Sequence, residues 1–236
     1  MSHPRQLVMD LATRPALGRA AFFVASSNVA ALSLVDGWRD WPGGRLMILG
    51  PEGAGKTHLA HVWAEQSDAR ILDATTLADQ DIPQLAAHGA VVLERLDALP
   101  DLAEGDRRAA EQAVFHLYNL MGAEQGRLML TSRIAPSRIL FLTPDLASRL
   151  QSVTLVELGA PDDTLLSAVL VKLMADRQLD APPALIQYLM PRMDRSLRAA
   201  EDLVARLDAE ALASRKPVTI PLARRVLEQG DDTPLS

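Results

Sequence analysis

The stretch that decides the fold reads Gly50-Pro51-Glu52-Gly53-Ala54-Gly55-Lys56-Thr57. It matches G-x-x-x-x-G-K-[ST], the pattern of a phosphate-binding P-loop. A short apolar segment, residues 45–49, precedes it and is predicted to be a buried strand, and a helix is predicted over 57–66. The glycines allow the backbone to curl around a phosphate with its N–H groups pointing inward. The helix that follows adds the positive end of its dipole.

The P-loop predicts a nucleotide site. The backbone of residues 50–57, with the neighbouring His58, is expected to hold the phosphates of ADP or ATP. Lys56 should reach the β- and γ-phosphates, and the Thr57 hydroxyl should bind Mg²⁺. The alternative, a structural glycine-rich turn, is disfavoured by the strand and helix on either side. His58 and His61 stand at i, i+3, where packing or solvation is a simpler interpretation than metal binding.

Composition describes an ordinary globular chain. It has 236 residues, 48% of them hydrophobic, and a formal net charge of −6. The negative charge argues mildly against DNA as the main partner. The absence of cysteine excludes disulfides and agrees with a cytoplasmic location. No signal peptide and no run of 18 apolar residues is present, so no membrane association is expected.

The order of the predicted elements indicates an α/β domain followed by a helical domain. Residues 1–20 are expected to form a flexible tail, 21–159 the α/β domain, 160–230 a small all-helical domain and 231–236 a second tail. Strands are predicted over 45–49, 70–73, 90–93, 128–131 and 152–156, with helices near 57–66, 107–122 and 144–150 between most of them. Short apolar strands between helices favour a parallel sheet covered on both faces. Helices are predicted over 162–177, 183–192, 195–215 and 220–229.

Glu94 ends a buried strand, where a P-loop protein needs an acid to hold Mg²⁺ through water. We therefore assign Glu94 to the metal, with a simple surface glutamate as the alternative. Many P-loop ATPases place a second acid next, to polarise the attacking water, but this chain has Arg95 there. A guanidinium stays protonated and cannot act as that base. Asp97 is a weak substitute, so the chain is expected to bind nucleotide better than it hydrolyses it.

Longer motifs resemble one family. They are FVASSN at 23–28, FHLYN at 115–119, LTPDLASRL at 142–150 and DRSLR at 194–198. With the P-loop domain and the helices after it, they resemble the AAA+ family of the bacterial replication initiator DnaA, and more closely its short Hda-type members, which inactivate DnaA. The resemblance covers residues 6–229. It implies an AAA+ sheet domain with a helical lid, in which the segment from Phe22 to Asn28 is a strand beside the adenine.

The resemblance also implies residue roles that the pattern alone does not. Arg149, otherwise a solvated helix charge, falls on the arginine-finger position, which acts in trans on a neighbouring DnaA. Arg195, predicted to open a helix, falls on the sensor 2 position and would close on the nucleotide from the lid. The segment from Gln6 to Leu11 resembles the peptide that docks on the sliding clamp of DNA polymerase III. In it Gln6 would be hydrogen-bonded, and apolar contacts would come from Leu7, Met9 and Leu11.

Three departures from the DnaA pattern qualify these implications. No helix-turn-helix domain follows residue 229, so sequence-specific DNA binding is not expected. Arg95 replaces the second acid, and Arg133 replaces the acid usual at the sensor 1 position. We therefore expect a regulator that holds ADP, is tethered to the clamp and stimulates hydrolysis of DnaA-bound ATP, with a homodimer possible. The alternatives are a self-sufficient ATPase of helicase-loader type, a DNA-binding initiator variant and a scaffold that binds nucleotide for stability alone.

Overall fold

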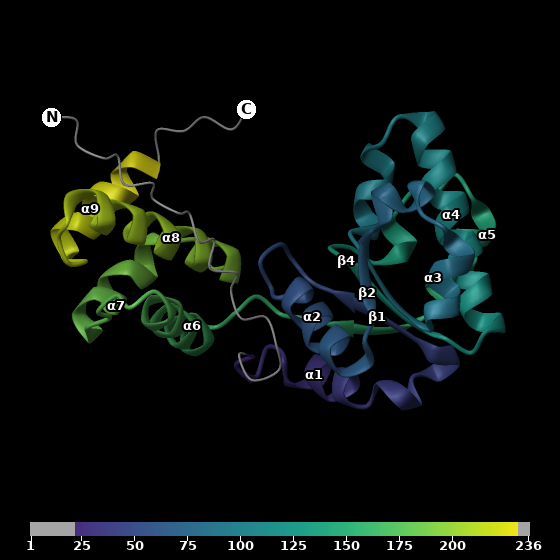
Figure 1. Ribbon diagram of the computed structural model, residues 1–236, viewed down its shortest axis with the longest axis horizontal. Helices are drawn as coiled ribbons and strands as arrows, with labels where there is room; N and C mark the ends of the chain where they lie inside the picture. The colour runs from purple at the N-terminus through teal and green to yellow at the C-terminus, as the bar shows by residue number, and fades with distance from the viewer. Residues whose placement is uncertain (1–21, 231–236) are drawn as a thin grey trace, which may run out of the picture.

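The computed structural model describes residues 22–230, and Figure 1 shows a sheet with its helices beside a separate group of helices. Five parallel strands form the sheet, in the order β2-β3-β4-β1-β5. Their bounds are β1 Arg45–Leu49, β2 Arg70–Asp73, β3 Ala90–Glu94, β4 Arg127–Ser132 and β5 Thr154–Glu157. The predicted parallel sheet, covered on both faces, is confirmed.

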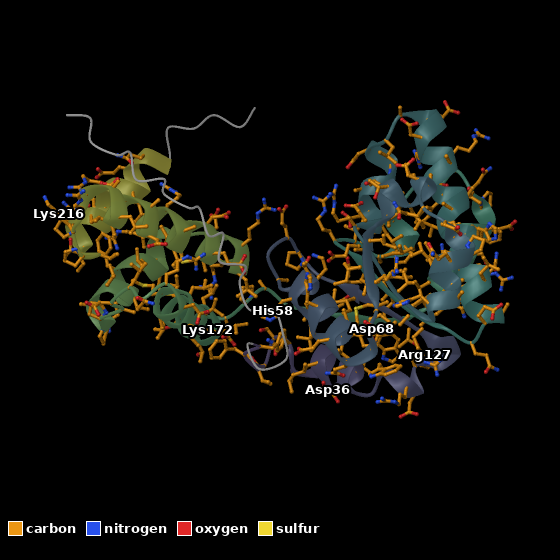
Figure 2. All side chains as sticks on the ribbon, viewed as in Figure 1. Asp36, His58, Asp68, Arg127, Lys172 and Lys216 are labelled. Atoms are coloured by element: carbon orange, nitrogen blue, oxygen red, sulfur yellow. The ribbon has the colours of Figure 1, made fainter. Side chains whose placement is uncertain are left out.

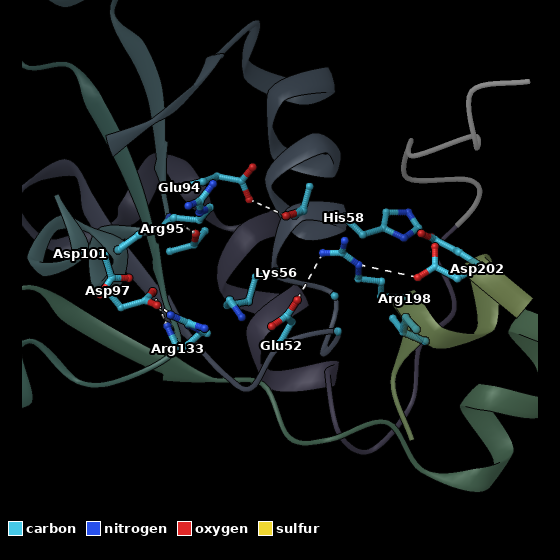
Figure 3. A pocket seen from close by; sticks show the side chains of 17 residues that line it. Glu52, Lys56, His58, Glu94, Arg95, Asp97, Asp101, Arg133, Arg198 and Asp202 are labelled. Carbon is cyan, nitrogen blue, oxygen red and sulfur yellow. Dashed lines mark hydrogen bonds and ion pairs between the residues drawn. The ribbon is translucent and has the colours of Figure 1, made fainter. Parts of the chain in front are cut away.

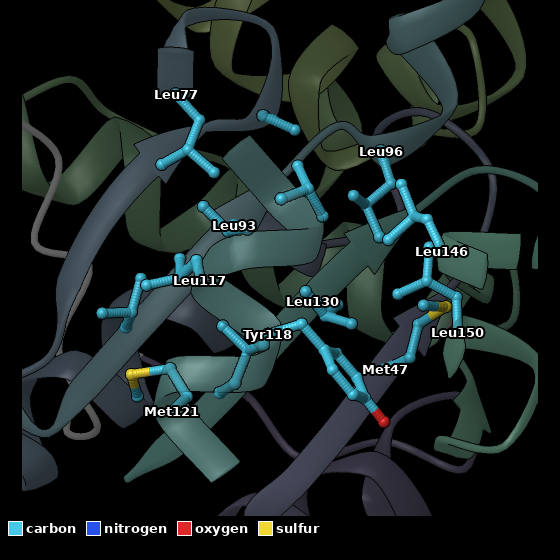
Figure 4. Packing of buried hydrophobic residues seen from close by; sticks show 14 of the residues in the cluster. Met47, Leu77, Leu93, Leu96, Leu117, Tyr118, Met121, Leu130, Leu146 and Leu150 are labelled. Atoms are coloured by element: carbon cyan, nitrogen blue, oxygen red, sulfur yellow. The ribbon is translucent and has the colours of Figure 1, made fainter. Parts of the chain in front are cut away.

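Two hydrophobic clusters cover the two faces of the sheet, because successive strand side chains point to opposite sides. On one face, Leu46 and Ile48 of β1 pack with α1 and α2. On the other, Met47 and Leu49 pack with α3, α4 and α5 (Figure 4). The helices are α1 Val29–Asp36, α2 Lys56–Ser67, α3 Ile82–His88, α4 Glu104–Ala123 and α5 Pro144–Gln151. The P-loop helix α2 and the helix α5 therefore lie on opposite faces.

Short 3₁₀ segments connect several of these elements. They are η2 Trp38–Asp40, η3 Pro42–Gly44, η4 Ala74–Asp79, η5 Leu96–Asp101 and η6 Pro136–Arg138. The guanidinium of Arg127, at the start of β4, donates to the carbonyls of Gln125 at 2.8 Å and Arg39 at 3.1 Å. Because Arg39 belongs to η2, this contact joins η2 to β4. In Figure 2, Arg127 is labelled on the α/β domain, and Lys172 and Lys216 are labelled on the helical domain described next.

The helical domain consists of α6 Asp163–Asp176, α7 Pro183–Leu189, η7 Met190–Arg192, α8 Leu197–Ser214 and α9 Ile220–Gly230. A third buried cluster, separate from the two on the sheet, holds these helices together through leucines such as Leu170, Leu189 and Leu207. Within residues 22–230, no helix combines the length and apolarity required to cross a bilayer.

Several sequence expectations differ from the structure. The segment from Phe22 to Asn28 is coil and turn instead of strand, because Asn28 donates to the Phe23 carbonyl at 2.8 Å and accepts from the Ala25 N–H at 2.9 Å. The last strand begins at Thr154 instead of Ser152, since Ser152 caps α5. The helices predicted from the sequence did not include α1 or α3.

Helix α4 holds both ends of α5. Near the start of α5, the buried carboxylate of Glu111 accepts from the backbone N–H groups of Leu142 at 3.1 Å and Thr143 at 2.8 Å. The same carboxylate pairs with Arg107 at 3.0 Å. Near the end of α5, the Tyr118 hydroxyl donates to the Arg149 carbonyl at 3.4 Å. A buried charge is tolerated when several donors satisfy it, and Glu111 has three.

Glu111→Ala should lower the free energy of unfolding by about 3–5 kcal/mol, because it leaves Arg107 unpaired and removes the acceptor for two backbone N–H groups. The matched control is Glu104→Ala on the same helix, where Glu104 makes an exposed pair with Arg108. Exposed pairs contribute about 1 kcal/mol or less. Urea unfolding followed by circular dichroism measures both variants, and equal losses would contradict a structural role for Glu111.

Candidate nucleotide-binding site

The P-loop lies between β1 and α2, at the carboxyl edge of the sheet, and forms one wall of a pocket of about 690 Å³ (Figure 3). Gly53 and Gly55 have φ values of +71° and +100°, which favour glycine. The Lys56 ammonium donates to the carbonyls of Gly50 at 2.7 Å and Pro51 at 2.8 Å. Among the residues assigned to nucleotide, the pocket wall contains Glu52, Gly53, Gly55, Lys56, Thr57 and His58. Gly50, Pro51 and Ala54 complete the loop without lining the pocket.

Thr57 and Glu94 meet in the pocket, as a Mg²⁺ site requires. The Thr57 hydroxyl donates to a Glu94 carboxylate oxygen at 2.6 Å. A hydroxyl and a carboxylate are hard oxygen donors of the kind Mg²⁺ prefers. With the glycine-lined loop and Lys56, they fit a magnesium nucleotide.

Partial burial disfavours the charged form of Lys56 and lowers its pKa. The charge of Asp97 opposes this effect, and the charge of Arg133 adds to it. A bound phosphate would favour the ammonium form and raise the pKa again. Nucleotide affinity and the protonation of Lys56 are therefore linked.

Asp97 is not available as a base in this arrangement. Its carboxylate accepts from the Arg133 backbone N–H at 2.8 Å and pairs with the Arg133 guanidinium. Burial alone would raise the pKa of Asp97, but the hydrogen bonds from Arg133 lower it. A carboxylate with a lowered pKa and both oxygens engaged is a weak proton acceptor.

Arg95 stands where many P-loop ATPases have a second acid, and its side chain points to the end of β2. Its backbone is left-handed, with φ of +62°, and its N–H donates to the Thr131 hydroxyl at 3.2 Å. Its guanidinium pairs with Asp73, at the end of β2, at 2.9 Å. The three residues lie at the ends of three adjacent strands, so the pocket edge is fixed across the sheet.

The helical domain closes directly on the P-loop. The Leu197 N–H, in the first turn of α8, donates to the Gly53 carbonyl at 2.8 Å. A Cβ on Gly53 would come within 2.3 Å of the Ser196 Cβ, so only glycine permits this approach. Arg198 then reaches Glu52 of the P-loop at 3.2 Å and Asp202 at 3.8 Å (Figure 3).

Arg195 does not line the pocket, and its closure on a bound nucleotide stays a prediction. Ser196 caps α8 by accepting from the Ala199 N–H at 3.0 Å, so the helix begins at Leu197 and Arg195 lies outside it. The Arg195 guanidinium pairs with Asp163 at 2.9 Å. The arginine that the lid contributes to the pocket wall is Arg198, one helical turn further on. The sequence signal that identifies it is Ser196 directly before an apolar residue, a typical N-cap.

Arg149 lies apart from the pocket of its own chain. It is exposed near the end of α5, on the sheet face opposite α2, and it does not line the pocket. Its guanidinium has no hydrogen-bond or ion-pair partner among residues 22–230. Gln6, Leu7, Met9 and Leu11 lie outside the described residues.

Comparison with known proteins agrees with this architecture. The family model of the Hda lid domain matches residues 163–227. The chromosomal replication initiator protein DnaA of Cutibacterium acnes is 24% identical over 92% of this chain. Domain III of DnaA from Thermotoga maritima superposes with a TM-score of 0.77 at 17% identity, covering 93% of this chain and 99% of that one. AMPPCP-bound DnaA from Aquifex aeolicus gives 0.69 at 17% identity, covering 90% and 69%.

The chain therefore shares the fold of DnaA domain III, and its helical domain matches the lid domain of Hda. The lid is the group of helices α6–α9, which the family model covers almost completely. The chain spans about half the length of the curated initiator it matches, 47% of that protein. The matched DnaA structure from Aquifex aeolicus holds a nucleotide analogue, AMPPCP.

Arg198→Ala should weaken ADP binding about tenfold, because a guanidinium that lines the pocket contributes a charge-assisted contact to phosphate. Arg195→Ala removes an arginine three residues away that points to Asp163, and should leave the affinity within about twofold. Titration with a fluorescent ADP analogue compares the two variants. A larger loss of ADP affinity in Arg195→Ala than in Arg198→Ala would show that Arg195 is the arginine that contacts phosphate.

Nucleotide affinity should fall as the pH rises through the pKa of Lys56 in the free protein. Below that pKa the lysine is already charged and affinity is constant. Above it, binding must add a proton, and affinity drops by up to about tenfold per pH unit. Because the pKa is lowered, the decline begins at a lower pH than an exposed lysine would give. Lys56→Arg, which does not titrate, should bind with a flat profile over the same range.

Proposed function

We propose that this protein regulates the initiation of replication by stimulating hydrolysis of ATP bound to DnaA. Its own pocket holds ADP with Mg²⁺ at Thr57 and Glu94, and the bound nucleotide sets the position of the lid. Arg149 acts in trans as an arginine finger, stabilising charge on the transferring γ-phosphoryl group. The segment from Gln6 to Leu11 tethers the protein to the DNA sliding clamp, which raises the effective concentration near DnaA.

The observation that carries the proposal is the position of Arg149. Its guanidinium is exposed and has no partner in the described part of the chain, and the sheet separates it from the P-loop helix of the same chain. A finger that acts on a second molecule requires this arrangement. The Hda-type lid and the DnaA-type fold support DnaA as that second molecule.

The side chains around the pocket favour a regulator over a self-sufficient ATPase. Arg95 cannot polarise water, and Asp97 is engaged by Arg133. Hydrolysis is therefore proposed to occur on the partner's nucleotide. Robust ATP turnover by this chain alone would favour the helicase-loader alternative.

Arg149→Ala should reduce the stimulation of DnaA by about 10³-fold or more, the range that arginine fingers supply, and leave ADP binding unchanged. The measurement is ATP hydrolysis by DnaA with clamp-loaded DNA and ADP, with and without this protein. Arg70→Ala, an exposed arginine at the start of β2, is the matched control and should stimulate normally. Full stimulation by Arg149→Ala would remove Arg149 from the mechanism.

A further inference from the structure

One carboxylate of the lid lines the nucleotide pocket without a partner. Glu201 lies on α8 and forms part of the pocket wall together with Leu197, Arg198 and Asp202. Its side chain is half-buried, and no group in the described part of the chain donates a hydrogen bond to it or forms an ion pair with it. Other carboxylates of the same wall are engaged, as Glu94 is by the Thr57 hydroxyl.

An unpaired, half-buried carboxylate costs free energy. Burial raises the pKa of Glu201, and the charge of Asp202 adds to this effect. The charges of Arg177 and Arg198 act in the opposite direction without cancelling it. Arg177 itself pairs with Asp208 at 4.0 Å. Glu201 would therefore gain from a hydrogen-bond donor on a bound molecule.

The register of α8 turns Glu201 towards the phosphate loop. The Leu197 N–H donates to the Gly53 carbonyl at 2.8 Å, and the Leu197 Cδ1 lies 3.1 Å from where a Cβ on Gly55 would be. Residues three and four apart share one face of a helix, so Glu201 lies on the face that carries Leu197 and Arg198. It is about 4.5 Å further along α8 than Arg198, at 1.5 Å per residue.

The pocket has a metal end and a lid end. Figure 3 shows Glu94 and Arg133 at one end of the pocket. His58 and Asp202 lie at the other end, with Lys56 between the two groups. A magnesium ion at Glu94 would put the terminal phosphates at the metal end. The nucleoside would then extend towards the lid end, where α8 contributes its carboxylates.

We infer that Glu201 is a specificity-determining residue whose carboxylate accepts a hydrogen bond from a ribose hydroxyl of the bound nucleotide. The inference rests on the nucleotide site of the proposed function and names the part of the ligand that the lid recognises. An ionised carboxylate only accepts hydrogen bonds, and it repels the oxygens of a phosphate. Its partner is therefore a donor on the nucleoside.

The sugar is the nearer donor of the nucleoside, because it is bonded directly to the α-phosphate and the base lies beyond it. Glu201 is one helical turn past Arg198, which reaches the phosphate loop at Glu52. The His58 ring packs edge-on against Phe22, with 5.1 Å between ring centroids. Phe22 begins the segment expected beside the adenine. The base is thus matched with that segment, and the ribose with Glu201.

Calorimetric titration of the full chain with ADP, 2′-deoxy-ADP and 3′-deoxy-ADP, each with Mg²⁺, tests this role. At least one deoxy analogue should bind the wild type about tenfold more weakly than ADP, because a hydrogen bond to a charged acceptor is lost. Glu201→Ala should bind ADP as weakly as that analogue and should not distinguish the two. Glu201→Gln keeps the shape and an uncharged acceptor oxygen, and should distinguish them about threefold. The matched control, Glu210→Ala, removes a carboxylate of α8 that pairs with Arg225 and should keep the wild-type ratio.

Equal binding of ADP and both deoxy analogues by the wild type would overturn the inference. So would a wild-type ratio in both Glu201 variants, or a ratio lost in Asp202→Ala and kept in Glu201→Ala. If Glu201→Ala lost a preference for ADP over IDP and kept the deoxy ratio, Glu201 would contact the base and its role at the sugar would be wrong. No binding of any of these nucleotides would overturn the nucleotide site itself. Ribose selectivity without stimulation of DnaA would overturn the proposed stimulation and leave the role of Glu201 in place.

Discussion

The contact between Gly53 and the first turn of α8 is the constraint on which the nucleotide site depends. The Gly53 carbonyl accepts from the Leu197 N–H, and the Ser196 Cβ lies where any side chain at residue 53 would clash. The lid therefore rests on the phosphate loop itself, and a phosphate that orders the loop also positions α8. Arg198 adds to this coupling, because its pairing with Glu52 joins the same two segments. A nucleotide phosphate that attracts Arg198 competes with Glu52 for it, so occupancy of the pocket changes the contact between lid and loop.

Hydrogen bonds and ion pairs engage three carboxylates of the pocket. Glu94 is engaged by Thr57, Asp97 by Arg133 and Glu52 by Arg198. The residue after Glu94 is a cation whose side chain points to Asp73. General-base catalysis requires a carboxylate free to accept a proton from water, and Asp97, with both oxygens engaged, does not offer one. The same pocket contains a lysine, a hydroxyl and a glycine loop, which are groups that bind phosphate and metal.

The sequence predicted the parts of the fold that depend on local pattern. The bounds of β1 and β2 match the prediction, because each strand has apolar residues between polar or turn-forming neighbours. The meeting of Thr57 with Glu94 also followed, since both positions are fixed by the P-loop and the end of β3. The predicted helix start at Arg195 was wrong, because Ser196 caps α8 and the helix begins at Leu197, which brings Arg198 to the pocket wall. Glu111 was not identified, although it is a charge on the apolar face shared by Val114 and Tyr118, and its partners in the β4–α5 connection come from tertiary packing.

The two faces of the sheet carry different features of the α/β domain. The face with α2 carries the phosphate loop and meets the lid, and the face with α5 carries Arg149. An arginine that reached its own pocket would be neutralised by the nucleotide already there, whereas one held across the sheet stays available to another molecule. Glu111 and Tyr118 of α4 maintain that separation, because they fix α5 at both ends. Under the proposed function, nucleotide in the pocket acts on the lid, while the opposite face keeps the same geometry for a partner.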